Sequence, residues 1–317
     1  MNEHEKFFSK IGRNYLILAI IATLFQVMVG IIIRATNPAL LNDTFIVTIL
    51  GSICNYILPL PIILYLMNKL EKTEIKKNKI TLKKFAIYIC ITITLMWIGN
   101  IDGTLITAII GGLMQNEIIN PVGELINNGG MYVNIIIISI MAPIFEEFLF
   151  RKILIDRTIK YGAKISILLS ALLFALFHGN LSQFFYAFLL GGFFAYIYIK
   201  TGELKYTIIL HGIINFTGSI ASIAFTSAIN NIIHSTNSIA ASDIIIAATY
   251  LTVIITGLMI GLYTLYKNRN INIDKIYEGI KIEKPVKTII LNAGTICFII
   301  YHIYIILKTT GLVPGII

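Results

Sequence analysis

The chain alternates between long apolar stretches and short charged or polar segments. A transmembrane helix needs about 20 mostly apolar residues to cross the hydrocarbon core. Stretches of this kind are residues 14–33, 44–67, 85–100, 131–150, 165–180, 183–199, 206–226, 240–266 and 288–307. The shorter apolar stretch 104–114 is expected to be re-entrant or to lie at the membrane surface. The pattern therefore predicts an all-α polytopic transmembrane helix bundle of about eight or nine spans.

Polar segments divide these spans into three parts. Residues 115–130 form a polar segment with Pro and Gly-Gly, which is typical of a loop. A second polar loop follows residue 226. We expect an N-terminal three-span region over 1–130, a four-span core over 131–226 and C-terminal spans over 227–317.

The charge pattern adds a topology. Twenty-three of the 25 Lys and Arg residues fall in five segments that share one side if the spans alternate. These segments are 1–13, 68–84, 151–164, 200–205 and 267–287. The positive-inside rule places that side, and the N-terminus with it, in the cytoplasm of a multi-pass cell-membrane protein.

Composition supports a membrane protein and excludes other classes. Hydrophobic residues make up 57% of the 317 residues and charged residues only 13%, against about 25% charged in soluble domains. The net charge of +9 is interpreted as contact with anionic lipid and not as a nucleic-acid interface. Cys54, Cys90 and Cys297 match no zinc or redox spacing, so we interpret them as buried thiols. No small-residue cleavage site follows the first span, so no cleavable signal sequence is expected.

The four-span core carries ionisable and polar side chains inside its apolar stretches. Such groups cost about 2.5–3.5 kcal/mol each at the centre of a span, so they are rare and usually functional. Their types, carboxylate, guanidinium, imidazole and amide, are those of hydrolytic chemistry. They are Glu146, Glu147, Arg151, His178, His211 and Asn215.

Two neighbouring carboxylates in the fourth span are predicted to have different surroundings. Glu147 and Arg151 are four residues apart, so they share a helix face and can form an ion pair. Glu146 points about 100° away from Glu147 and is left without a local partner. A desolvated carboxylate of this kind is suited to act as a general base. Pro143 removes a backbone hydrogen bond and should leave one carbonyl free in a distorted helix.

Two further spans supply the remaining polar groups. His211 and Asn215 lie four residues apart and could direct two donors to one point, as an oxyanion site requires. They could equally form an interhelical hydrogen-bonded pair. His178 lies at the end of the fifth span, with Phe174 on the same helix face.

These residues resemble the motifs of the CAAX-protease and bacteriocin-processing family, also called the Abi family. The three motifs stand here in order as Glu146-Glu147-x-x-x-Arg151, Phe174-x-x-x-His178 and His211-x-x-x-Asn215. The resemblance covers roughly residues 131–225. It implies a glutamate-dependent intramembrane endopeptidase without a metal, acting on a membrane-associated peptide or protein.

The resemblance also implies a role for each motif residue. Glu146 and His178 activate the attacking water, and His211 and Asn215 stabilise the developing oxyanion. Glu147, Arg151 and Phe174 support these residues.

Three alternatives remain open at this point. Two His and one Glu could hold zinc, although no His-Glu-x-x-His helix is present. The protein could instead be an immunity factor that binds a bacteriocin or its receptor without cleavage. It could also be a transporter, although the chain shows no pair of interrupted helices in matching halves.

Overall fold

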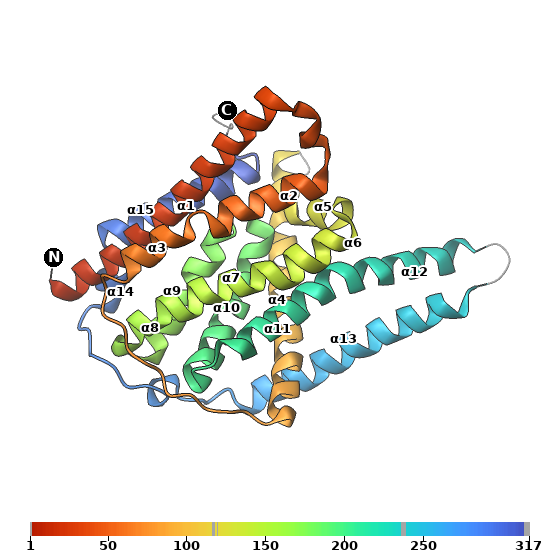
Figure 1. Ribbon diagram of the computed structural model, residues 1–317. Helices are drawn as coiled ribbons and strands as arrows, with labels where there is room; N and C mark the ends of the chain where they lie inside the picture. The colour runs from red at the N-terminus through yellow and green to blue at the C-terminus, as the bar shows by residue number, and fades with distance from the viewer. Residues whose placement is uncertain (1, 116–117, 119, 236–238, 314–317) are drawn as a thin grey trace.

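The computed structural model describes residues 2–115, 118, 120–235 and 239–313. Within these ranges the chain is helical and contains no strand (Figure 1). The α-helices are α1 Glu3–Thr36, α2 Thr44–Ser52, α3 Leu60–Met67, α4 Leu82–Met114, α5 Pro121–Asn128, α6 Gly130–Tyr132, α7 Ala142–Glu147, α8 Leu154–Thr158, α9 Ala163–Phe177, α10 Leu181–Thr201, α11 Leu204–Phe216, α12 Ser222–His234, α13 Ala241–Lys267, α14 Pro285–Ile289 and α15 Ala293–Thr309.

Several of these helices join end to end through π-helical or 3-10 segments. The π-helical segments are η2 Ile53–Ile57, η3 Val133–Met141, η4 Phe148–Ile153 and η6 Thr217–Ala221. The 3-10 segments are η1 Pro38–Asn42, η5 Ile159–Tyr161 and η7 Ile273–Lys275. Continuous helices therefore run over Thr44–Met67, Gly130–Tyr161 and Leu204–His234.

The predicted all-helical membrane bundle is confirmed, but the expected number of spans was too high. Seven helices in the described ranges are long and apolar enough to cross a membrane. The other two apolar helices, α9 and α15, have 15 and 17 residues. At 1.5 Å per residue they are about 22 and 26 Å long, which is less than the roughly 30 Å hydrocarbon core.

The third span also differs from the prediction. Helix α4 is continuous over Leu82–Met114, so 104–114 is neither re-entrant nor a separate surface segment. The polar and small residues near position 103 do not break the helix, because they serve its packing against α10. A Cβ atom at Gly103 would collide with the carbonyl oxygen of Ser182, so glycine permits a close helix approach there.

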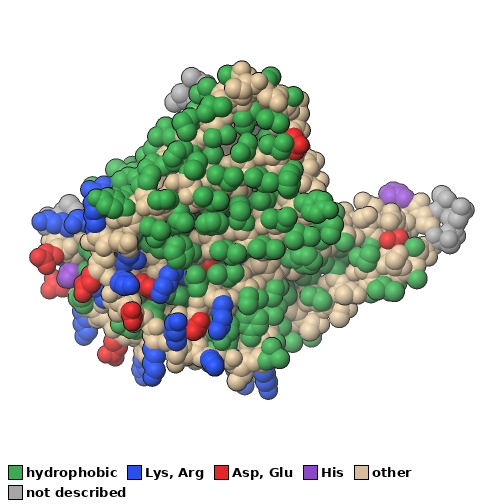
Figure 2. Space-filling model, in the orientation of Figure 1, with side chains coloured by type: hydrophobic (Ala, Val, Ile, Leu, Met, Phe, Trp, Pro, Cys, Tyr) green, Lys and Arg blue, Asp and Glu red, His purple; other side chains and the backbone are tan. Residues whose placement is uncertain are grey.

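The five basic segments lie at one end of the molecule, as the charge pattern predicted. Figure 2 shows Lys and Arg side chains gathered at that end, with hydrophobic side chains over most of the face in view. Contacts between the segments hold them together. Examples are the rings of Phe8 and Tyr161, and the hydrogen bonds from Thr73 N–H to the Asp156 carbonyl, from Asn78 N–H to the Thr201 carbonyl and from Ile280 N–H to the Lys160 carbonyl. That this end faces the cytoplasm stays a prediction.

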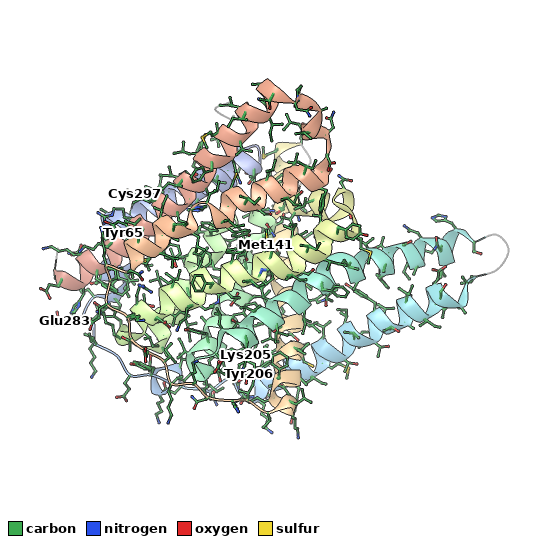
Figure 3. All side chains as sticks on the ribbon, viewed as in Figure 1. Tyr65, Met141, Lys205, Tyr206, Glu283 and Cys297 are labelled. Carbon is green, nitrogen blue, oxygen red and sulfur yellow. The ribbon has the colours of Figure 1, made fainter. Side chains whose placement is uncertain are left out.

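The cysteines correct another expectation. Cys54 is buried, but Cys90 is only partly buried and Cys297 on α15 is exposed (Figure 3). An apolar run does not separate residues that face the protein core from residues that face lipid, because both surroundings are apolar.

Candidate active site

The predicted ion pair in the fourth span is present and is completely buried. The Arg151 guanidinium donates from Nε to Glu147 Oε2 at 3.0 Å and from Nη2 to Oε1 at 3.1 Å. Both side chains have zero exposure. Arg151 Nη1 also donates to the hydroxyl of Ser170 on α9 at 2.8 Å, and that hydroxyl donates to the Phe150 carbonyl. The guanidinium is therefore bonded on three nitrogens, which a buried charge requires.

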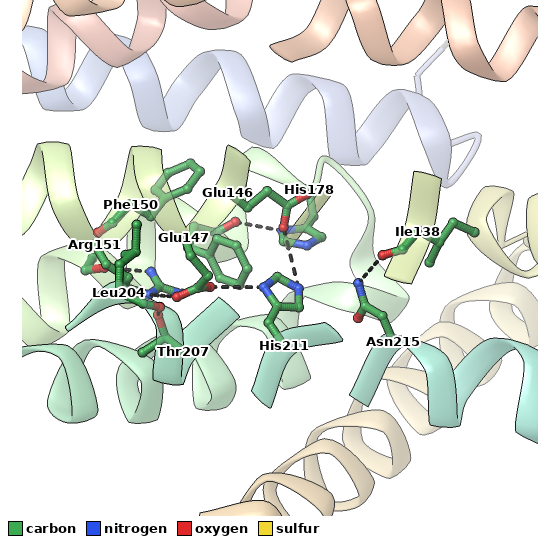
Figure 4. Close-up of polar contacts among 12 residues, drawn as sticks. Ile138, Glu146, Glu147, Phe150, Arg151, His178, Leu204, Thr207, His211 and Asn215 are labelled. Carbon is green, nitrogen blue, oxygen red and sulfur yellow. Dashed lines mark hydrogen bonds and ion pairs between the residues drawn. The ribbon is translucent and has the colours of Figure 1, made fainter. Parts of the chain in front are cut away.

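His211 on α11 brings the two glutamates into one cluster (Figure 4). Its Nδ1 lies 3.0 Å from Glu147 Oε1, and its Nε2 lies 3.7 Å from Glu146 Oε2. Glu147 therefore accepts hydrogen bonds from both Arg151 and His211. A carboxylate that only accepts fixes the proton on His211 Nδ1 and orients the ring so that Nε2 faces Glu146.

Glu146 has no partner on its own helix, as its position predicted, and it is less buried than Glu147. Its side chain is 13% exposed. One carboxylate oxygen, Oε1, accepts a hydrogen bond of 2.6 Å from the hydroxyl of Tyr56. The other oxygen, Oε2, faces His211 at a distance too long for a direct hydrogen bond.

Phe174 connects the second motif to the cluster. Its ring makes edge contacts with the imidazole of His178 at 4.7 Å and with that of His211 at 5.9 Å between ring centroids. The Arg151 guanidinium lies 4.6 Å from the centroid of the same ring. His178 Nδ1 is 2.8 Å from the Phe174 carbonyl oxygen, so Nδ1 carries the proton and Nε2 is left as an acceptor.

Asn215 binds the carbonyl that the distorted fourth span leaves free. In the π-helical segment η3, the N–H of Ala142 bonds to the Ile137 carbonyl, five residues earlier. The next donor in this pattern would be Pro143, which has no N–H. Asn215 Nδ2 donates to the Ile138 carbonyl at 2.8 Å in its place. Gly212 permits the close approach, because a Cβ there would lie 2.8 Å from the Ser139 carbonyl oxygen.

The structure thus brings all three motifs together, although the sequence separates them widely. Glu146, Glu147, Arg151, His211 and Phe174 form one contact network, His178 joins it through Phe174, and Asn215 lies one helical turn from His211. Sequence reasoning did not find Ser170 or Tyr56. Ser170 has no signal beyond its polarity in an apolar helix, and Tyr56 lies in the N-terminal region, far from the motifs along the chain.

A separate cavity lies outside this network. It has a volume of about 540 Å³ and is formed by α4, the segment before α5 and the start of α10. Its lining is uncharged and mixes polar residues, including Thr107, Asn120 and Ser182, with apolar ones such as Ala108 and Ile118. Within the described ranges, no three His, Cys, Asp or Glu side chains are grouped as metal ligands. The zinc alternative, in which two His and one Glu of the site hold the ion, stays untested.

The comparison with known families agrees with the three motifs. Residues 128–217 match the family described as Type II CAAX prenyl endopeptidase Rce1-like. Residues 128–217 are therefore similar to the CAAX protease family, and the match supports membrane protease activity in general. No curated protein and no solved structure gave a significant match to the chain.

Proposed function

We propose that this protein is an intramembrane endopeptidase that hydrolyses a peptide bond near the end of a membrane-associated peptide or protein. The observation that carries the proposal is the pair of adjacent glutamates in unequal surroundings. Glu147 is saturated by Arg151 and His211, whereas Glu146 keeps one oxygen without a direct hydrogen bond. A carboxylate with a free oxygen, beside an imidazole and inside a membrane protein, is a candidate general base.

The reaction begins with a water molecule bound to Glu146. Glu146 takes a proton from the water, and His178 is the second polar group that orients this water. The water oxygen then attacks the scissile carbonyl carbon. A new C–O bond forms, and the carbonyl oxygen becomes negatively charged. The proton then passes to the peptide nitrogen, the carbonyl re-forms as the C–N bond breaks, and a carboxylic acid and an amine leave.

His211 and Asn215 supply the donors for the oxyanion in this proposal. Protonated His211 would donate from Nδ1 to Glu147 and from Nε2 into the site. Two carboxylates, one guanidinium and one imidazolium then sum to zero charge, which suits a cluster enclosed by apolar helices. Asn215 Nδ2 has two hydrogens and uses one on Ile138, so the second can serve the oxyanion.

Cleavage of defined peptides by the purified protein in lipid vesicles tests the proposal. The panel contains membrane-associated peptides that end in Cys-aliphatic-aliphatic-X, each with and without a prenyl group, and unlipidated amphipathic peptides. We expect wild type to cleave at least one class and Glu146→Gln to cleave none. Asp102→Asn is the matched control, because it makes the same carboxylate-to-amide change on α4.

Two results would contradict the proposal. Equal cleavage by wild type and Glu146→Gln would remove Glu146 from the reaction. Background cleavage of the whole panel by wild type would favour the non-enzymatic immunity role. A chelator arm, with and without added zinc, separates the metal-independent reaction from the zinc variant.

A further inference from the structure

Tyr56 contacts the proposed catalytic base from a part of the chain that the family match does not cover. It lies in η2 of the second span, 90 residues before Glu146. Its hydroxyl donates to Glu146 Oε1 at 2.6 Å, a short distance that is typical of a hydroxyl bound to a charged oxygen. The N-terminal region therefore reaches directly into the cluster.

The helix that carries Tyr56 is distorted at this residue. Residues Ile53–Ile57 are π-helical, and the N–H of Leu58 bonds to the Ile53 carbonyl five residues earlier. Pro59 follows and donates no backbone hydrogen bond. The extra residue in the turn rotates the positions that follow, a feature frequently found at functional sites. The same combination of a π-helical segment and a proline, η3 with Pro143, precedes Glu146 in the fourth span.

The ring of Tyr56 is fixed as well as its hydroxyl. It stacks on Phe145 with 5.5 Å between ring centroids and 14° between planes. Phe145 directly precedes Glu146 in the chain. The stacked ring and the short hydrogen bond together define one orientation of Tyr56 relative to the Glu146 carboxylate.

This contact makes the two oxygens of Glu146 unequal. Oε1 is occupied by the Tyr56 hydroxyl. Oε2 faces His211 Nε2 across 3.7 Å and makes no direct hydrogen bond to it. Oε2 is therefore the oxygen without a hydrogen-bond partner among the described residues, and it can accept a proton from water on the side where His211 lies.

We propose that Tyr56 is a positioning residue that holds Glu146 so that Oε2 is the proton-accepting oxygen. The inference rests on the proposed endopeptidase function, and it adds a residue from outside the motif-bearing core. Without the hydroxyl, the Glu146 carboxylate can rotate, and the fraction of productive orientations falls.

The first test is Tyr56→Phe, which keeps the ring and its stacking on Phe145. We expect kcat to fall about 10- to 100-fold, the scale of a displaced catalytic group, with KM within about twofold, because the proposed role of the hydroxyl is to hold Glu146 and not to bind the substrate. The control is Tyr15→Phe. Tyr15 is fully buried, and its hydroxyl donates to the Leu149 carbonyl on the same fourth span, also at 2.6 Å. It should keep the wild-type kcat.

Each kinetic result decides between a positioning role and a structural one. A fall in kcat for Tyr56→Phe alone supports the inference. Equal falls for both variants would make the loss a general effect of a missing hydrogen bond, and an unchanged kcat for Tyr56→Phe would overturn the inference while leaving the protease proposal intact.

A second measurement does not depend on activity. Infrared difference spectra between wild type and Tyr56→Phe should contain a shifted carboxyl stretching band. The shift should vanish when both proteins also carry Glu146→Gln. A spectrum without that shift would contradict the contact between Tyr56 and Glu146. This result does not require that the protein cleaves any peptide of the panel, so the inference and the protease proposal can fail separately.

Discussion

Glu146 and Glu147 are adjacent in the chain, yet they lie in opposite kinds of surroundings. Glu147 has no exposed surface and accepts hydrogen bonds from Arg151 and His211. Glu146 is partly exposed and, among the described residues, accepts one direct hydrogen bond, from Tyr56. The charge of Glu147 is therefore compensated within the fold, whereas Glu146 can still accept a hydrogen bond from a substrate or from water.

The difference follows from helical geometry and from which helices lie on each side. Successive residues point about 100° apart on a helix, so Glu147 faces Arg151 and α11, while Glu146 lies between Tyr56 of the second span and the other side of His211. The comparison predicts that changes around Glu147 mainly affect stability, and that changes around Glu146 mainly affect turnover.

The largest effect expected is on turnover, from Glu146→Gln. The amide keeps the shape and the Tyr56 contact but cannot accept a proton. We expect kcat to fall about 10²- to 10⁴-fold, the usual contribution of a general base, with thermal stability in detergent near that of wild type. Measuring peptide cleavage and unfolding temperature on the same preparation checks both statements.

The companion variant Glu147→Gln sharpens this test. It leaves Arg151 as a buried cation without its carboxylate, so it should lower stability more than Glu146→Gln does. If Glu146→Gln proved the more destabilising of the two, the assignment of structural and chemical roles would be wrong.

The next effect is on stability, from Arg151→Ala. The change removes the cation that pairs with the Glu147 carboxylate among apolar helices, and breaking such a buried pair costs about 3–5 kcal/mol. Lys152→Ala is the matched control, because Lys152 also pairs with an acid four residues away but is 48% exposed. We expect about 0–1 kcal/mol for the control. Chemical unfolding in mixed micelles measures both, and equal losses would contradict a special role of the buried pair.

Much of this cluster could be predicted from local sequence rules. The Glu147–Arg151 pair follows from their separation of four residues, and the free carbonyl near Pro143 follows from the missing N–H. The charge pattern predicted that five basic segments share one end, because alternating spans return each of them to the same side.

Other features depend on contacts between distant segments, which local rules do not supply. The bond from His211 to Glu147 joins residues 64 apart, and the bond from Tyr56 to Glu146 joins residues 90 apart. The continuity of α4 depends on how Gly103 packs against α10. Hydropathy also overestimated the number of full spans, since it records apolar character and not where a helix begins and ends.

A smaller effect on stability is expected from Asn215→Ala. The variant leaves the Ile138 carbonyl without its donor, and an interhelical hydrogen bond in a membrane contributes about 1–2 kcal/mol. Under the proposed mechanism kcat falls as well. Thr217→Ala is the control, because the Thr217 hydroxyl bonds only to the Ile213 carbonyl of its own turn. Loss of stability without loss of turnover would limit Asn215 to a structural role and remove it from the oxyanion site.

The smallest effect expected is from Ser170→Ala, which tests how far the saturated surroundings of Glu147 extend. Ser170 links Arg151 to the Phe150 carbonyl between two helices. Its loss should cost about 1 kcal/mol, because the guanidinium keeps both bonds to Glu147. Ser166→Ala is the control, since Ser166 is equally buried on α9 and bonds only to the Gly162 carbonyl. Turnover should stay at the wild-type level in both variants. A marked fall in turnover for Ser170→Ala would mean that the Glu147 side of the cluster also sets the chemistry at Glu146, and the division between the two glutamates would fail.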